Sequence, residues 1–114
     1  MNKDENLLFV CSRNKWRSPT AERVYYQKGF SVRSAGTSPN AKRTVSANDI
    51  RWSSYIFVME KKHKQRLIAK FKPLTEHKKI IILDIPDDYQ YMDEELIEIL
   101  QDTVGCYLQN NIDR

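Results

Sequence analysis

The hydrophobic residues of this chain of 114 residues occur in short continuous runs, separated by stretches in which apolar residues recur at helical spacing. A continuous apolar run of about four to eight residues between turn residues is typical of a buried strand. On this basis we expect strands at residues 6–10, 30–34, 55–59 and 79–83.

The stretches between these runs predict helices, because their apolar residues recur every three or four positions. We expect helices over residues 17–28, 45–52, 61–70 and 93–108. Proline is tolerated in a first helical turn and glycine favours a helix end, which places Pro19 and Gly29 at the two ends of the first helix. The side chains expected to face the core are Ala21, Val24, Tyr25, Val45, Ile50, Trp52, Leu67, Ile68, Phe71, Leu96, Ile97, Leu100, Val104 and Leu108.

This alternation of strands and helices predicts an α/β fold with a parallel sheet and helices on both of its faces. A chain of 114 residues is long enough for one hydrophobic core. We therefore expect a single domain that spans residues 1–114.

Charge is distributed unevenly along the chain. Basic residues dominate up to Lys79, whereas from Ile80 onward Arg114 is the only base, against nine acids that start at Asp84. A basic first part suits an anionic substrate. Two solvated faces that partly neutralise each other explain the same pattern equally well.

Several classes of function are not indicated by this composition. No apolar run approaches the ~20 residues of a membrane helix, and the first six residues do not resemble a signal peptide, so we expect no membrane partner. The basic run Lys61-Lys62-His63-Lys64 has no interleaved aromatic residue, and we expect no nucleic-acid partner. His63 and His77 both lie in basic contexts, and we interpret them as solvated surface residues.

The chain has two cysteines, Cys11 and Cys106, and neither belongs to a CxxC motif or a Cys/His cluster. We therefore expect no metal and no cofactor. A cysteine that works as a thiolate needs a reducing compartment, which predicts a cytoplasmic protein.

The candidate chemistry lies where the first strand passes into the first helix. Five residues separate Cys11 from Arg17, and the hydroxyl of Ser18 follows. A free thiol titrates near ~8.5, so only about 3% is thiolate at pH 7. A helix N-terminus favours an anion by about 0.3–2 kcal/mol. Loop amides, the Arg17 charge and a hydrogen bond from Ser18 would add to this.

The same groups would bind a phosphate-like dianion. The amides of residues 12–17 would form an anion-binding nest, and Arg17 would supply a bidentate fork. One loop would then activate a nucleophile and hold the group that it attacks. The alternative is a buried structural Cys11 with Ser18 as a helix cap.

The segment from Val10 to Pro19 resembles the signature of the low-molecular-weight protein tyrosine phosphatases, whose relatives include the thioredoxin-coupled arsenate reductases. The resemblance implies a three-layer sandwich with a four-stranded parallel sheet of order 2-1-3-4, and a site at the carboxyl end of the first strand. Asn14 stands where the family has a loop-bracing asparagine. Ser34-Ala35-Gly36-Thr37 and Ile56-Phe57-Val58-Met59-Glu60 are similar to two further segments of the family.

This chain departs from the family pattern in three places. Arg13 replaces the usual glycine, which would permit positive φ, and Trp16 replaces a second cysteine. The segment from Thr37 to Val45 is short and lacks the aromatic residue that usually lines the crevice. By resemblance, Ser34 and Asn40 would belong to a hydrogen-bond network around Asn14 and Ser18.

A phosphatase of this kind also needs an acid to protonate the leaving oxygen. The segment 83–91 follows the last strand and resembles the family's acid loop, which makes Asp87 the candidate, with Asp84 and Asp88 as rivals. Tyr89 and Tyr91 on this loop, and Trp16, would form walls for an aromatic ring, or else they serve in packing.

The leading hypothesis is a cysteine-dependent phosphatase that hydrolyses phosphate monoesters through a cysteinyl-phosphate. Its substrate would be a phosphorylated protein or a small phosphate ester, and we expect a monomer. The alternatives are an arsenate reductase-like enzyme and a non-catalytic phosphate- or phosphopeptide-binding module. The expected catalytic residues are Cys11, Arg17 and Asp87, and the expected substrate-binding residues are Ser12, Arg13, Asn14, Lys15, Trp16, Ser18 and Tyr89.

Overall fold

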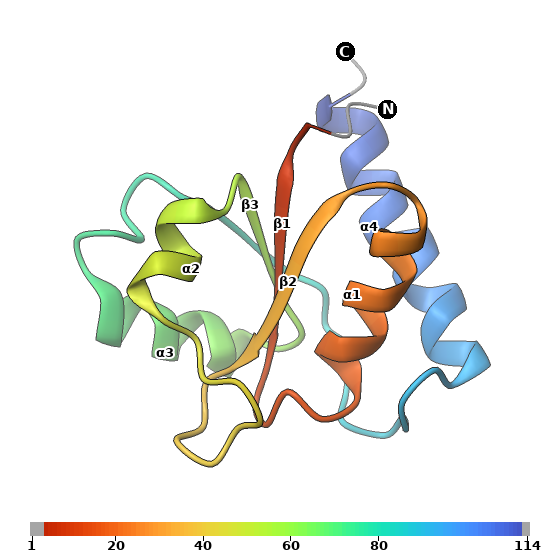
Figure 1. The fold of residues 1–114 in the computed structure, drawn as a ribbon, viewed down its shortest axis with the longest axis horizontal. Coiled ribbons are helices and arrows are strands. Elements are labelled where there is room, and N and C mark those ends of the chain that lie inside the picture. The colour runs from red at the N-terminus through yellow and green to blue at the C-terminus, as the bar shows by residue number, and fades with distance from the viewer. Residues whose placement is uncertain (1–3, 113–114) are drawn as a thin grey trace.

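Strands and helices alternate along the chain in the computed structural model, which describes residues 4–112 (Figure 1). The strands are β1 (Asn6–Cys11), β2 (Ser31–Gly36), β3 (Tyr55–Val58) and β4 (Lys79–Ile82). The helices are α1 (Arg17–Gln27), α2 (Ala47–Trp52), α3 (Lys61–Phe71) and α4 (Glu94–Ile112). Each expected element is present, with its ends shifted by a few residues.

The four strands form one parallel sheet in the order β2-β1-β3-β4, which confirms the predicted topology. β1 is flanked on both sides, and Cys11 at its end lies opposite Gly36 of β2. The chain therefore leaves β1 between the ends of two neighbouring strands. That position brings residues from both neighbours to the segment that follows Cys11.

Two hydrophobic cores lie on the two faces of the sheet. Leu7, Phe9 and Cys11 point into one core, and Leu8 and Val10 point into the other, as the two-residue period of a strand requires. Figure 1 shows α1 and α4 on one side of the sheet and α2 and α3 on the other. The arrangement is thus the three-layer α/β sandwich that the sequence predicts.

The expected core residues are buried in most cases. The fully buried members are Ala21, Val24, Tyr25, Val45, Ile50, Leu67, Leu96, Leu100, Val104 and Leu108. The other four, Trp52, Ile68, Phe71 and Ile97, are half-buried. They lie at the edges of the helix faces that cover the sheet.

The second helix begins two residues later than the hydrophobic pattern predicts, because Ser46 caps it. The Ser46 hydroxyl accepts a hydrogen bond from the amide of Asp49 at 3.2 Å, and the Asp49 carboxylate accepts one from the amide of Ser46 at 3.0 Å. This reciprocal pair holds Ser46 outside the helix. Val45 is buried nonetheless, on the strand-like segment that leads into α2.

Gly36, at the end of β2, is packed directly against the loop that follows β1. A Cβ atom at this position would lie 2.5 Å from the carbonyl oxygen of Ser12 and 3.0 Å from the amide nitrogen of Asn14. It would also lie 2.6 Å from the Cβ of Ala41. Only glycine permits this close approach, which explains the glycine of the Ser34-Ala35-Gly36-Thr37 motif.

Replacement of Gly36 by alanine is therefore expected to lower the free energy of unfolding by about 1–3 kcal/mol, because backbone atoms would have to move. Gly105→Ala is the matched control. Its new Cβ would lie 3.7 Å from the Tyr25 hydroxyl, an ordinary contact, within α4. Alanine in a helix is favoured over glycine by about 0.5–1 kcal/mol. Urea unfolding of both variants tests this, and a Gly36→Ala variant as stable as the wild type would contradict it.

Candidate active site

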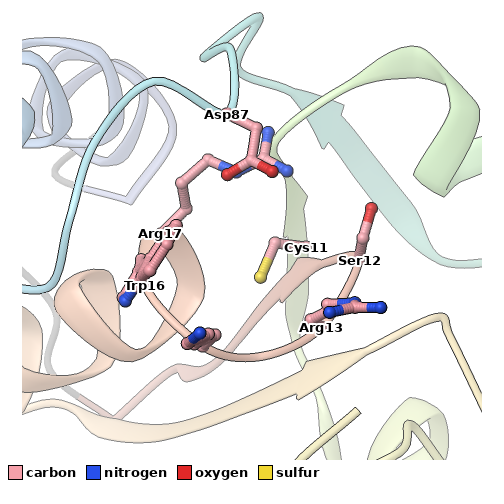
Figure 2. Close-up of a pocket in the computed structure, with 7 residues that line it drawn as sticks. Cys11, Ser12, Arg13, Trp16, Arg17 and Asp87 are labelled. Carbon is pink, nitrogen blue, oxygen red and sulfur yellow. The ribbon is translucent and has the colours of Figure 1, made fainter. Parts of the chain in front are cut away.

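The Cys11 sulfur lies at the base of a pocket of about 250 Å³ at the carboxyl end of β1. The loop from Ser12 to Trp16 curves around the sulfur and then enters α1 (Figure 2). The pocket is lined by Cys11, Ser12, Arg13, Lys15, Trp16, Arg17 and Asp87. The cysteine side chain is almost fully enclosed, with 3% of its surface exposed, so it is reached through this pocket.

The start of α1 supplies favourable electrostatics for an anion. Trp16 precedes the helix and provides no side-chain cap. The first amides of a helix have no intrahelical partner, and the helix dipole makes this end partly positive. The end of the loop is therefore suited to bind phosphate oxygens.

The shape of the loop depends on Asn14, which has a left-handed backbone with φ of 55°. Arg13 is not among the described residues with positive φ, so the glycine usual at its position in the family is not needed there. Asparagine tolerates this conformation better than most residues. The Asn14 side chain is buried and donates hydrogen bonds of 2.9 Å to both Ser18 and Ser34.

These hydrogen bonds restrict the direction in which Ser18 donates. An asparagine amide nitrogen only donates, so the Ser18 oxygen is an acceptor toward Asn14. The Ser18 proton then has two acceptors within reach, the Cys11 sulfur at 3.0 Å and the carbonyl oxygen of Ala35 at 3.5 Å, and the sulfur is the nearer one. On the other branch, Ser34 accepts from Asn14 and donates to a carboxylate oxygen of Glu22 at 2.5 Å. The network thus presents a hydroxyl to the sulfur.

Arg17 is 2% exposed and reaches across the pocket mouth. Its Nη1 donates to Glu60 at 2.5 Å and to the carbonyl oxygen of Ile85 at 2.8 Å. Burial alone would raise the pKa of the Glu60 carboxyl, but the hydrogen bond and charge of Arg17, with the charge of Lys62, hold that pKa below its ordinary value. Glu60 is therefore ionised and orients the guanidinium, whose Nε lies on the side of Asp87 (Figure 2).

The sequence indicated that His63 is a solvated surface residue, and this prediction is wrong. His63 is fully buried beside the loop that follows Cys11. Its Nδ1 accepts a hydrogen bond of 3.0 Å from the amide of Glu60. The neutral ring therefore carries its proton on Nε2, which donates to the Ser12 hydroxyl at 2.8 Å. The Ser12 proton is then free to point into the pocket, where Ser12 is a lining residue.

A signal for His63 was present in the sequence. Glu60 follows a buried strand, and His63 comes three residues later, which is the spacing of a capping box. Because parallel strands end at the same edge of the sheet, this turn had to lie near Cys11. The basic neighbours of His63 point outward, and for this reason the sequence suggested that His63 is exposed as well.

Of the three candidate acids, the structure brings only Asp87 to the pocket. One Asp87 carboxylate oxygen lies 3.6 Å from Nε of Arg17, across from the sulfur in Figure 2. Asp84 has a left-handed backbone and lies in a separate groove beside Glu60. Asp88 is exposed and does not line the pocket of Cys11. The sequence could not choose among these three acids, and their positions in the structure favour Asp87.

The aromatic residues fall into two groups. Trp16 lines the pocket, and the Lys15 ammonium lies 4.6 Å from its ring centre. Tyr89 is half-buried against the core between the sheet and α4 and is not a pocket residue. Tyr91 is 51% exposed and lines a different groove, with Tyr26. Of these three aromatic residues, Trp16 alone lines the pocket of Cys11.

Asn14 and Ser18 are buried behind the loop and brace it, rather than line the pocket. Ser34 belongs to their network as expected. Asn40 does not: its side chain is exposed, and its backbone amide donates to Ser38 at 3.1 Å. The short loop after β2 turns before Asn40 can reach Asn14.

Other sites are not indicated in the part of the chain that the structure describes. Residues 4–112 contain no group of three His, Cys, Asp or Glu side chains that could hold a metal ion. No helix within the same range is long and apolar enough to cross a membrane. Cys11 and Cys106 form no disulfide, and Cys106 is exposed on α4.

Comparison with known proteins supports the fold. No protein-family model matches the chain, and no curated protein sequence matches it significantly. Solved structures do match. YwlE arginine phosphatase from Geobacillus stearothermophilus has 22% sequence identity and a TM-score of 0.67, with 94% of this chain and 97% of that chain covered.

Two further matches are described as tyrosine phosphatases. Wzb from Escherichia coli K30, in complex with phosphate, has 18% identity and a TM-score of 0.76, covering 95% of this chain and 99% of that one. A low-molecular-weight phosphotyrosine phosphatase from Vibrio cholerae O395 has 24% identity and a TM-score of 0.67, with coverage of 95% and 99%. A YwlE mutant with serine in place of cysteine carries a phosphorylated active-site serine. This chain has the fold of these low-molecular-weight phosphatases over nearly its whole length.

The buried His63 leads to a prediction about stability and pH. Burial and the Arg17 charge lower the pKa of His63 to about 4, from an ordinary value of 6.5. Between these values the unfolded chain binds more protons, so the free energy of unfolding falls as the pH drops from about 6.5 to about 4. The loss attributable to His63 is up to about 3 kcal/mol.

Urea unfolding at a series of pH values tests this for the wild type and for His63→Asn. We expect the variant to lose most of the pH slope in this window, whatever its stability at neutral pH. His77→Asn, at an exposed histidine, is the control and should retain the slope. An unchanged slope in His63→Asn would show that the ring does not titrate as stated.

Proposed function

We propose that this protein is a cysteine-dependent phosphatase that hydrolyses phosphate monoesters through a cysteinyl-phosphate intermediate. The observation that carries the proposal is the Cys11 sulfur at the base of a pocket, 3.0 Å from the Ser18 hydroxyl. The buried Arg17 faces the same space. A nucleophile and the groups that bind its target thus share one loop.

In the first step, the Cys11 thiolate attacks phosphorus. The S–P bond forms and the bond from phosphorus to the leaving oxygen breaks, and protonated Asp87 donates its proton to that oxygen. In the second step, the Asp87 carboxylate accepts a proton from water, the water oxygen attacks phosphorus and the S–P bond breaks. Inorganic phosphate leaves and the thiolate is restored, with Asp87 again protonated.

Arg17 and the loop amides act on the charge of the transferring group. The equatorial phosphoryl oxygens carry that charge in the transition state, and a fork of donors fixed in place stabilises it without rearrangement. Glu60 fixes the guanidinium before the substrate arrives. Ser12, positioned by His63, adds a hydroxyl at the wall of the same pocket.

The substrate that fits this pocket best is an aryl phosphate such as phosphotyrosine, because Trp16 offers an aromatic face beside the sulfur. The phosphorylated serine of the YwlE mutant supports a covalent route on this fold. The thiolate chemistry of Cys11 suits the reducing cytoplasm.

Cys11→Ser is expected to reduce the turnover of p-nitrophenyl phosphate by at least about 1,000-fold, because a hydroxyl cannot replace the thiolate as nucleophile. Cys106→Ser is the matched control, since that thiol is exposed on α4, and it should keep wild-type activity. Circular dichroism checks that both variants fold. Tight vanadate binding by a wild type without turnover would instead identify a binding module.

The role of Asp87 is tested by pH–rate profiles of three matched variants, Asp84→Asn, Asp87→Asn and Asp88→Asn. We expect Asp87→Asn alone to lower kcat by about 100- to 10,000-fold for phenyl phosphate, whose leaving group needs a proton. The loss should be smaller for p-nitrophenyl phosphate, whose leaving group is more acidic. An equal loss in Asp84→Asn or Asp88→Asn, or none in Asp87→Asn, would assign the acid elsewhere.

A further inference from the structure

The mouth of the catalytic pocket carries several exposed cations. Arg13 and Lys15 both line the pocket, and both side chains are exposed to solvent. Arg13 and Trp16 lie on opposite sides of the pocket, with Cys11 between them (Figure 2). Asp87 is the one acidic residue among the described lining residues, and the proposed mechanism already uses it.

A second group of cations is brought to the same edge by the loop after β2 and by α3. The amide of Lys42 donates to the Arg13 carbonyl oxygen at 3.0 Å, which places Lys42 beside the loop that follows Cys11. Arg66 of α3 donates to the Thr37 hydroxyl at 3.2 Å, and the Thr37 amide in turn donates to the Cys11 carbonyl oxygen at 3.0 Å.

The first turn of α3 adds Lys62 to this edge. Its ammonium lies 4.0 Å from Glu60, the partner of Arg17. Lys62 also lines a groove next to the site, together with Glu60 and Asp84. We call Arg13, Lys15, Lys42, Lys62 and Arg66 the cationic rim. Its members come from three separate segments of the chain.

The cationic rim is not required to hold the transferring phosphoryl group. Arg17 and the start of α1 lie at the Cys11 loop itself, whereas the rim side chains are exposed around it. Charges of one sign around a cleft raise the local concentration of oppositely charged ligands and their rate of association. The rim can therefore act on groups of the substrate that flank the phosphate.

We propose that the substrate of this site is an aryl phosphate presented by an acidic protein segment, that is, phosphotyrosine with neighbouring aspartate or glutamate residues. The proposal rests on the phosphatase function proposed above and names the substrate class of that site. Trp16 contacts the ring, Arg17 and the loop amides hold the phosphoryl group, and the cationic rim contacts the flanking carboxylates. A phosphopeptide with flanking lysine or arginine residues is disfavoured at this rim.

The test compares phosphotyrosine peptides of equal length with glutamate, alanine or lysine at the flanking positions. At a salt concentration of about 20 mM, we expect kcat/KM for the acidic peptide to exceed that for the lysine peptide by about tenfold or more. The difference should shrink to about threefold or less near 300 mM, because salt screens exposed charges. Equal values for the two peptides at low salt, or a higher value for a phosphoarginine peptide, would overturn the proposal.

Two double variants distinguish an effect of the cationic rim from an effect of the net charge of the protein. Lys42→Gln with Lys62→Gln removes two rim charges, whereas Lys28→Gln with Lys70→Gln removes two charges at the ends of α1 and α3 remote from the site. The first pair should lose about threefold or more of the preference for the acidic peptide. The second should keep it. Loss of the preference in both pairs alike would show an effect of net charge and would refute the rim.

Failure of this proposal can be told apart from failure of the phosphatase assignment. Turnover of p-nitrophenyl phosphate reports catalysis alone, because that substrate has no flanking residues. Binding of the three peptides to Cys11→Ser, measured by fluorescence anisotropy, reports the charge preference without any turnover. The acidic peptide should bind Cys11→Ser more tightly than the lysine peptide by about the same factor, and equal binding would contradict the proposal even if the enzyme is active.

Discussion

The two N–H groups of the Asn14 amide determine the chemistry of this site. Both are donated within the protein, one to Ser18 and one to Ser34. Because an amide nitrogen cannot accept, the Ser18 proton is left for the Cys11 sulfur, the nearer acceptor, or for the Ala35 carbonyl oxygen. A left-handed backbone at a residue other than glycine costs about 1 kcal/mol or more, and it persists where the surroundings fix it. Here the two buried hydrogen bonds provide that constraint, since leaving them unmade would cost more.

The sheet order explains why this loop can be held from two sides. β1 lies between β2 and β3, so the loop after Cys11 is flanked by the ends of both. From β2 come Ser34, which accepts from Asn14, and Gly36, whose missing side chain lets the loop approach. From the turn after β3 come Glu60 and His63, which hold Arg17 and Ser12. A strand at the edge of the sheet would have only one such neighbour.

The sequence was sufficient for those features that depend on local pattern. The apolar runs and the helical spacing predicted the parallel sheet. The family resemblance implied the strand order and the position of the Cys11 loop. It was not sufficient where a side chain's direction is decided by distant packing. His63 lies in a run of cations, and its spacing of three residues from Glu60 is the one sequence feature that distinguishes it as the residue that points inward. Tyr89 similarly packs against the hydrophobic core between the sheet and α4.

Choosing among Asp84, Asp87 and Asp88 also needed the path of the chain. These acids lie within five residues of one another, and all three are aspartates, so residue type does not distinguish them. The structure separates them because the backbone turns at Asp84, where φ is 56°, and then brings Asp87 back over the pocket. That turn depends on the contact of Ile85, whose carbonyl accepts from Arg17 and whose amide donates to Met59 at 2.8 Å.

The ion pair between Arg17 and Glu60 is better explained by the proposed phosphatase reaction than by stability. A charge that is 2% exposed loses most of its hydration, and a buried pair often contributes no net stability compared with apolar residues of the same volume. The pair does, however, fix the guanidinium at Nη1 and leave its remaining edge directed to the pocket. A flexible arginine would have to lose side-chain entropy when the phosphate binds, whereas this one has lost it on folding. The loss of side-chain entropy thus occurs on folding and not during the reaction. Electrostatic stabilisation of a transition state requires groups that are already in place in this way.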